Sequence, residues 1–224
     1  MTDVKRLACA IDHTLLKPDT TAGMIEKLCE EAVLYGFATV CVNPFYVELA
    51  SSILRDSSVK ICTVIGFPLG ASTTRIKVLE ASNAIVNGAK ELDIVLSIGS
   101  LVAGDYKAVV EDLSTVVSVA AAKKVTSKVI IETCLLNYNQ KISACAIVNE
   151  VGANFIKTST GFSTGGATIE DVKLLRANVG RNTLVKASGG IRDAEFALAL
   201  LDAGAERIGT SNGVRMIEQL SIAA

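Results

Sequence analysis

The sequence predicts an α/β fold, a single (β/α)8 TIM barrel over residues 1–224. Three observations predict it: short apolar runs recur along the whole chain, segments with helical periodicity separate them, and several helix ends share a glycine that precedes the next run. The apolar runs are continuous rather than alternating, which is typical of parallel strands buried on both faces. Eight strand–helix units in 224 residues fit the compact end of the size range of this fold.

Eight strands are expected at the apolar runs, the last two of which are short. In chain order the runs cover residues 7–11, 38–42, 61–65, 92–96, 129–131, 154–156, 184–185, and 207–208 with its continuation.

Helices are expected between the runs, where apolar residues recur at three- and four-residue spacing. The first carries Met24, Ile25, Leu28 and Ala32 behind a cap at residues 20–21, and the others cover residues 44–56, 73–87, 104–123, 138–151, 168–178, 193–203 and 213–220.

Local signals mark both ends of several of these helices. Thr168 and Asp193 stand where an N-terminal cap is expected. Glycines such as Gly36 and Gly152 follow the last helical residue and supply the left-handed conformation that ends a helix. The main alternative, an open doubly wound sheet, would require a GxGxxG loop after its first strand, and the sequence has none there.

Composition excludes several classes of function. The chain has 22 Lys and Arg against 23 Asp and Glu, so its net charge of −1 offers no attraction for nucleic acid or an anionic membrane. No apolar stretch reaches the roughly 18 residues of a membrane span, and residues 1–17 lack the apolar centre of a signal peptide. The single histidine, His13, argues against a multi-histidine metal site, so no metal is expected.

The six cysteines form no CxxC pair and lie in apolar stretches. Buried, reduced thiols in a cytoplasmic protein explain this pattern better than a disulfide framework does.

Polar side chains stand at the ends of the expected strands, where a TIM barrel carries its chemistry. An ionised group in an apolar strand is costly unless it is paired, so several such groups at equivalent places indicate a site. The candidates are Asp12, Cys41, Asn43, Asp93, Glu132, Lys157 and Lys186.

The two lysines are the strongest of these candidates, because they end neighbouring strands. Each ammonium group would disfavour the charge of the other, and burial would add to this effect, which leaves one amine neutral and nucleophilic. Asp93 would exchange protons with such a lysine. The alternative is that Lys157 and Lys186 form ion pairs with Asp93 or Glu132, or extend outward.

Asp12 and Cys41 are counted with the substrate-binding residues. Asp12, like Glu132, would accept a hydrogen bond that orients a lysine. Cys41 would line the pocket rather than act as a nucleophile, because no histidine is placed to activate it.

Loops of small residues follow the last two expected strands, at residues 188–192 and 209–213, and each leads into a helix. Glycines let backbone N–H groups approach an anion, and a helix N-terminus adds positive potential. A third loop, residues 160–166, follows the sixth strand and joins this cradle. The alternative is that these glycines only make turns. The predicted phosphate-binding residues are Gly189, Gly190, Arg192, Gly209, Ser211, Thr160 and Gly161.

The chain resembles the class I (Schiff-base) deoxyribose-phosphate aldolase family along nearly its whole length. The segments that carry the resemblance are residues 11–17 (IDHTLLK), 40–44 (VCVNP), 64–70 (VIGFPLG), 91–93 (ELD), 131–133 (IET), 155–166 (FIKTSTGFSTGG), 185–192 (VKASGGIR) and 207–211 (RIGTS).

The resemblance implies a TIM barrel that reversibly cleaves 2-deoxy-D-ribose 5-phosphate to acetaldehyde and D-glyceraldehyde 3-phosphate. The substrate is therefore a small sugar phosphate, no metal or organic cofactor is needed, and a homodimer is expected. The same resemblance gives the imine to Lys157, an assisting role to Lys186 and the proton relay to Asp93. It places the phosphate contacts at Gly189, Gly190, Ser211, Gly209 and Arg192.

Two other functions stay open on the sequence. One is a Schiff-base aldolase of the same fold for a different sugar phosphate, since the two lysines do not settle substrate length. The other is a sugar-phosphate-binding protein without catalysis, which would have no need for Lys157, Lys186 and Asp93 together.

Overall fold

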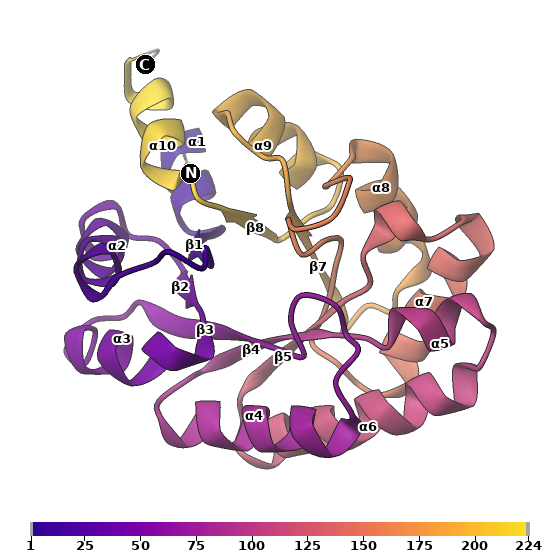
Figure 1. The fold of residues 1–224 in the computed structure, drawn as a ribbon. Coiled ribbons are helices and arrows are strands. Elements are labelled where there is room, and N and C mark those ends of the chain that lie inside the picture. The colour runs from indigo at the N-terminus through magenta and orange to yellow at the C-terminus, as the bar shows by residue number, and fades with distance from the viewer. Residues whose placement is uncertain (1, 223–224) are drawn as a thin grey trace.

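The computed structural model describes residues 2–222 and shows a closed barrel of eight parallel strands surrounded by helices (Figure 1). Each strand pairs with the next in chain order, and β1 closes the barrel against β8. The predicted TIM barrel is thus confirmed; residue 1 and residues 223–224 of the predicted domain lie outside the described residues. The strands are β1 (Ile11–Leu15), β2 (Thr39–Val42), β3 (Lys60–Ile65), β4 (Glu91–Val95), β5 (Thr126–Ile130), β6 (Phe155–Lys157), β7 (Leu184–Ser188) and β8 (Arg207–Thr210).

Helices form an outer ring around the strands (Figure 1). They are α1 (Asp3–Ala8), α2 (Ala22–Tyr35), α3 (Val47–Ile53), α4 (Thr74–Val86), α5 (Ile98–Val102), α6 (Tyr106–Ala122), α7 (Tyr138–Glu150), α8 (Ile169–Asn178), α9 (Ala194–Asp202) and α10 (Gly213–Ile222), with short 3-10 turns at Pro44–Tyr46 and Thr133–Leu135.

Several elements differ from the prediction. The expected strand at residues 7–11 is wrong, because Leu7 and Ala8 end helix α1, which the Thr2 side chain caps, and the strand begins only at Ile11. The expected helix at 44–56 splits into a 3-10 turn and α3. The short helix α5 was not expected at all. At residues 7–11, a few apolar residues fit either a strand or a buried helix turn, and packing decides between them.

The predicted caps are confirmed at two helices. Thr168 accepts a hydrogen bond from the N–H of Asp171, and Asp193 accepts one from Phe196. Thr21 stands at the N-cap of α2, but its side chain makes no capping hydrogen bond.

Alternation along the strands gives the barrel two different faces. Side chains such as Ile11, Val40, Leu92 and Ile94 point outward and form one large apolar core with the helices. The inward face holds a small separate apolar cluster around Cys41, Cys62, Val64 and Leu16, and beside it a set of buried charged groups.

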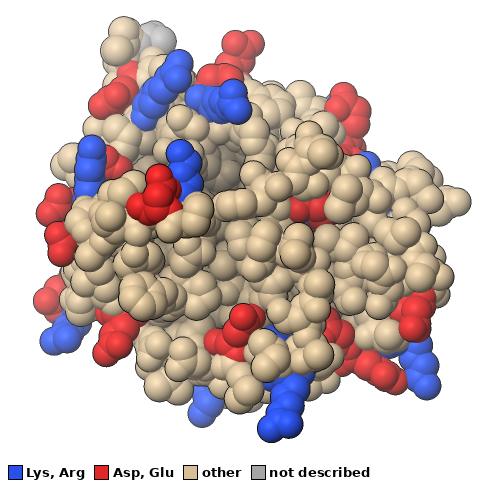
Figure 2. All heavy atoms as spheres, in the orientation of Figure 1, with Lys and Arg blue, Asp and Glu red and all other residues tan. Residues whose placement is uncertain are grey.

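The face of the molecule drawn in Figure 2 carries no single dominant charge. Figure 2 shows acidic and basic side chains interspersed around the edge of this face, while most of its centre carries neither, in agreement with a net charge of −1. Within residues 2–222, no helix combines the length and the low polarity that a membrane crossing requires.

Candidate active site

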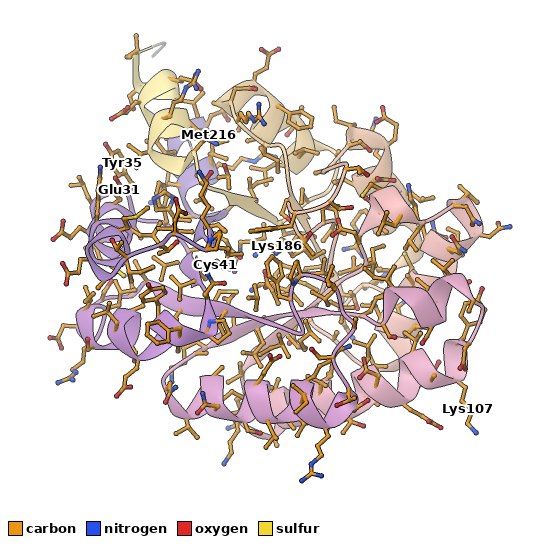
Figure 3. The ribbon with its side chains drawn as sticks, viewed as in Figure 1. Glu31, Tyr35, Cys41, Lys107, Lys186 and Met216 are labelled. Carbon is orange, nitrogen blue, oxygen red and sulfur yellow. The ribbon has the colours of Figure 1, made fainter. Side chains whose placement is uncertain are left out.

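Charged side chains from several strands meet inside the barrel, and we call them the interior cluster. Strand register brings them together: Asp93 of β4 lies directly opposite Lys128 of β5, and Lys157 of β6 lies opposite Lys186 of β7. Figure 3 shows Lys186 and Cys41 within the ring of helices, whereas Lys107 extends from α6 into solvent. The interior cluster consists of Asp12, Glu91, Asp93, Lys128, Lys157, Lys186 and Arg207.

Asp93 is the centre of the interior cluster and contacts three ammonium groups. Its Oδ2 accepts hydrogen bonds from Lys157 Nζ at 2.7 Å and Lys186 Nζ at 2.8 Å. Its Oδ1 accepts from Lys128 Nζ at 2.9 Å and from the Cys62 thiol at 3.2 Å. One carboxylate oxygen therefore connects the two lysines that the sequence singles out.

Further ion pairs extend from the partners of Asp93 to Asp12, Glu91 and Arg207. Lys186 Nζ also bonds to Asp12, and Arg207 Nη1 donates to Asp12 Oδ1 at 2.5 Å. Lys128 Nζ lies 2.6 Å from Glu91 Oε2, which Arg207 also contacts at 3.2 Å. Each of these charged groups forms an ion pair with at least one group of opposite charge, so the free-energy cost of burying it is offset by its partners.

The ion pairs fix the protonation of most of the interior cluster. Burial alone would raise the pKa of Asp93, but the ammonium groups of Lys128, Lys157 and Lys186 outweigh it and hold this pKa well below its usual value. Burial alone would lower the pKa of Lys186, yet the carboxylates of Asp12 and Asp93 raise it above that of a free lysine. The Asp93 carboxylate and the Lys186 ammonium are thus both charged at neutral pH.

The two predicted lysines differ in what they can reach. Lys186 is fully buried and bonds to two carboxylates, so it is neither free nor neutral. Lys157 has 3% of its surface exposed, contacts one carboxylate and lines an open pocket of about 420 Å³. Only Lys157 of this pair can attack a molecule in the pocket.

Three loops surround the mouth of this pocket, at residues 160–166, 188–192 and 209–213, and we call them the glycine rim. Eight of the predicted site residues line the pocket: Lys157, Thr160, Gly161, Gly189, Gly190, Arg192, Gly209 and Ser211.

Two glycines of this rim sit where a side chain would not fit. A Cβ on Gly209 would lie 3.1 Å from Lys186 Cε and 2.9 Å from Ser188 Cβ, so this glycine leaves room for the lysine stem. Gly189 has a φ of 87°, and a Cβ there would lie 3.0 Å from the backbone of Gly166. The rim is therefore built by close approach of backbone segments, which suits binding of an anion by N–H groups.

One expectation for the rim needs correction. The loop at 188–192 was expected to gain positive potential from the helix that follows, but the Asp193 carboxylate already caps the N-terminus of α9 through Phe196 N–H. What this loop offers to the pocket is its backbone and the Arg192 side chain.

Six of the predicted candidates do not line the pocket: Asp12, Cys41, Asn43, Asp93, Glu132 and Lys186. Asp12, Asp93 and Lys186 are all fully buried; Asp93 bonds to Lys157, and Lys186 bonds to both Asp93 and Asp12. Cys41 is fully buried, and with Cys62 and Asp93 it places two sulfur atoms and a carboxylate oxygen within 4.8 Å of one another. Lys128 Nζ already approaches that group, 3.3 Å from Cys62 Sγ.

Asp12 and Glu132 were both expected to accept a hydrogen bond from a lysine, and among the residues that the structure describes only Asp12 does so. Asp12 does bond to Lys186, as predicted. The prediction for Glu132 is wrong: its carboxylate accepts hydrogen bonds from the backbone N–H and the hydroxyl of Thr160, so it fixes the loop at 160–166 instead of a lysine.

Sequence reasoning missed several residues of the site. Lys128, Glu91 and Arg207 belong to the interior cluster, but only strand register reveals this, because they lie outside the apolar runs or at their edges. Lys17 and Phe162 also line the pocket, and both lie within segments that carry the family resemblance. For Lys17, the available signal was a cation beside a predicted anion site.

Comparisons with known proteins agree with this geometry. A family model described as DeoC/LacD family aldolase matches residues 6–216. The chain is 55% identical over 214 residues to the deoxyribose-phosphate aldolase of Thermoanaerobacter sp. (strain X514), covering 95% of this chain and 96% of that protein. It is 54% identical over 222 residues to that of Carboxydothermus hydrogenoformans (98% and 97%). The tetrameric deoxyribose phosphate aldolase from Aeropyrum pernix has a TM-score of 0.91 at 34% identity (99% and 96%).

Proposed function

The chain belongs to the DeoC/LacD aldolase family, and on this premise we propose that it cleaves 2-deoxy-D-ribose 5-phosphate reversibly to acetaldehyde and D-glyceraldehyde 3-phosphate through an imine on Lys157. The relatives named above support the reaction. The assignment of the imine to Lys157 is supported by one observation: of the two predicted lysines, Lys157 alone lines the pocket, and it bonds to Asp93.

Covalent catalysis begins with attack of the neutral Lys157 amine on the open-chain aldehyde carbon, C1. Loss of water gives an imine, which takes up a proton to become an iminium ion, and this ion draws electrons from the C2–C3 bond. A water held by Asp93 and Lys186 takes the proton of the C3 hydroxyl. The C2–C3 bond then breaks: its electron pair forms an enamine on C1–C2, and C3 becomes the aldehyde of glyceraldehyde 3-phosphate.

The second half of the reaction returns the proton. The enamine accepts a proton at C2 from the same relay and becomes an iminium again. Hydrolysis of this iminium releases acetaldehyde and regenerates the Lys157 amine. Asp93 serves this relay as a permanent carboxylate, because the surrounding ammonium groups keep its pKa low.

The glycine rim would hold the 5-phosphate away from the imine. Gly189, Gly190, Gly209 and Ser211 would supply backbone and hydroxyl donors, and Arg192 would supply a charge. Lys157 and these residues line one pocket, so a single sugar phosphate can contact both. Thr160 and Gly161 border the same space, and Asp12 and Cys41 would act from beneath it, by orienting Lys186 and by packing.

Reductive trapping tests the proposal. Borohydride in the presence of acetaldehyde should add a two-carbon group to the peptide that contains Lys157, and acetaldehyde should be released from deoxyribose 5-phosphate. An adduct on Lys186 would reverse the two roles. A trapped imine without acetaldehyde release would indicate an aldolase for another sugar phosphate, and no adduct at all would indicate a binding protein.

We also propose that the enzyme works in the cytoplasm as a homodimer. Six free cysteines, four of them buried, fit a reducing compartment. Exposed apolar side chains such as Leu34, Phe45 and Val86 offer surface for a second copy. Light scattering coupled to size-exclusion chromatography would give the mass; a monomer at micromolar concentration would contradict the dimer.

A further inference from the structure

The interior cluster does not contain equal numbers of positive and negative groups. It holds three carboxylates (Asp12, Glu91, Asp93) and four basic groups (Lys128, Lys157, Lys186, Arg207), connected by ion pairs of at most 3.7 Å. If every group were ionised, the inside of the barrel would carry one excess positive charge. An uncompensated buried charge is costly, so one basic group is under pressure to lose its proton.

Geometry indicates which group gives up the proton. Lys186 and Arg207 each contact two carboxylates, and Lys128 lies within 4.0 Å of three. Among the carboxylates of residues 2–222, Lys157 forms an ion pair with Asp93 alone, and it shares that Asp93 oxygen with Lys186. It also borders the pocket, where a released proton can leave. Loss of its proton balances the interior cluster at three against three.

We infer that Lys128 is a positioning residue, whose charge forces Lys157 to be the neutral amine of the site, and that Glu91 is the carboxylate that moderates this effect. The inference rests on the proposed function, because it takes Lys157 as the amine that forms the imine. Lys128 is fully buried and absent from the pocket lining, so it acts through Asp93 and not on the substrate.

Lys128 also determines which lysines bind each carboxylate oxygen of Asp93. It binds Oδ1 of Asp93, and Cys62 donates to the same oxygen, which leaves Oδ2 to Lys157 and Lys186. Without Lys128, Asp93 could turn both oxygens toward Lys157 and hold its proton more firmly. The charge and the position of Lys128 therefore act in the same direction.

All eight strands contribute a titratable or charged group to the space around Lys157. Those other than Lys157 itself are Asp12 on β1, Cys41 on β2, Cys62 on β3, Glu91 and Asp93 on β4, Lys128 on β5, Lys186 on β7 and Arg207 on β8.

Substitutions of opposite charge should shift the pH dependence of Lys157 in opposite directions. Lys128→Met removes a positive charge, so Lys157 keeps its proton to a higher pH. Glu91→Gln removes a negative charge, so Lys157 loses its proton at a lower pH. A purely structural role would lower activity in both variants without moving the two midpoints apart.

The experiment measures the rate of reductive trapping of acetaldehyde on Lys157 against pH, by mass mapping of the adduct. For Lys128→Met the midpoint should move up by about one pH unit or more, with a corresponding loss of about tenfold or more in trapping rate below the midpoint. For Glu91→Gln the midpoint should move down by a smaller amount. Lys128→Arg keeps the charge and should restore most of the wild-type midpoint.

A matched control comes from a buried lysine outside the barrel interior. Lys77 on α4 is as deeply buried and pairs with Asp112 at 2.6 Å. Lys77→Met should lower stability and leave the trapping midpoint in place. If circular dichroism shows that Lys128→Met does not fold, the trapping midpoints of Lys128→Arg and Glu91→Gln test the inference instead.

Two outcomes would overturn the inference: equal midpoints in all variants, or shifts of Lys128→Met and Glu91→Gln in the same direction. In both cases the wild-type adduct still maps to Lys157. A wild-type adduct on another residue would instead refute the proposed function.

Discussion

The interior cluster and the glycine rim lie on either side of Lys157 and are built in opposite ways. The interior cluster uses long charged side chains on rigid strands, each held by ion pairs to its neighbours. The rim uses glycines and hydroxyls on loops, where backbone segments approach closely. Covalent chemistry needs a fixed balance of charge around one amine, whereas binding a phosphate needs several donors close to one point. Changes in the two regions should therefore alter different kinetic constants.

The largest effect is expected from Lys186→Leu in the interior cluster. Asp12 and Asp93 would each lose a buried partner, which costs about 3–5 kcal/mol in the free energy of unfolding. Lys157 would lose its cationic neighbour and keep its proton, so kcat should fall by orders of magnitude. Raising the pH should recover part of the adduct formation here and none in Lys157→Leu. Equal recovery in both variants would contradict the division of roles.

The same variant should unfold at a higher pH in acid. In the wild type, burial alone would raise the pKa of Asp12, but Lys186, Lys128 and Arg207 outweigh it and lower this pKa. A carboxyl with a lowered pKa contributes stability above about pH 3.9, its unfolded value, and this contribution is lost as pH falls through the folded value. Without Lys186 the folded pKa rises and the contribution shrinks. Acid titration followed by circular dichroism measures the shift; an unchanged midpoint would contradict it.

A smaller effect, on a different constant, is expected in the glycine rim. Gly190→Asp places a carboxylate beside the pocket at a residue whose φ is 76°. Repulsion of the phosphate dianion should raise KM for deoxyribose 5-phosphate by about tenfold or more, while unphosphorylated deoxyribose is affected much less. Steady-state kinetics on both substrates separates the two regions, and equal losses on both would argue against a phosphate site here.

The exposed cations of the pocket should contribute less. Lys17 and Arg192 border the pocket near the glycine rim, and both are exposed to solvent. Lys17→Ala or Arg192→Ala should raise KM for the phosphorylated substrate by a few-fold, because a solvent-exposed charge pair is worth about 1 kcal/mol or less. Added salt should reduce the difference between variant and wild type. A loss of kcat with KM unchanged would place these side chains in the chemistry instead.

No effect is expected from chelation. The imine mechanism uses lysines, carboxylates and water, so incubation with EDTA should leave acetaldehyde release unchanged. Loss of activity that zinc or another divalent ion restores would refute the Schiff-base mechanism.

The two regions also differ in how far the sequence reveals them. The loops of the glycine rim are continuous segments, so their spacing after expected strands could be recognised, and seven predicted rim residues do line the pocket. The interior cluster joins residues as distant as Asp12 and Lys186, and its register depends on how the strands align when the barrel closes. Lys128 was missed for this reason: next to Ser127 it resembles the polar start of a strand, and only its place opposite Asp93 gives it a role.

The predicted bounds of the strands and helices show a similar contrast between what periodicity reveals and what packing decides. The strands and long helices were predicted to within a few residues because their periodicity is strong. Helix α1 was taken for part of a strand, since Leu7 and Ala8 are buried by packing against other helices and not by pairing in the sheet.

Closure of the barrel brings the first and last helices, α1 and α10, side by side (Figure 1). The order of the strands in space therefore does not depend on where the polypeptide is cut. A circular permutant that joins the two ends with a short flexible linker, and opens the chain between Asp56 and Ser57 ahead of β3, should keep all eight strand pairings. It should retain acetaldehyde release at close to the wild-type KM, because the new ends lie in a turn that belongs neither to the interior cluster nor to the glycine rim.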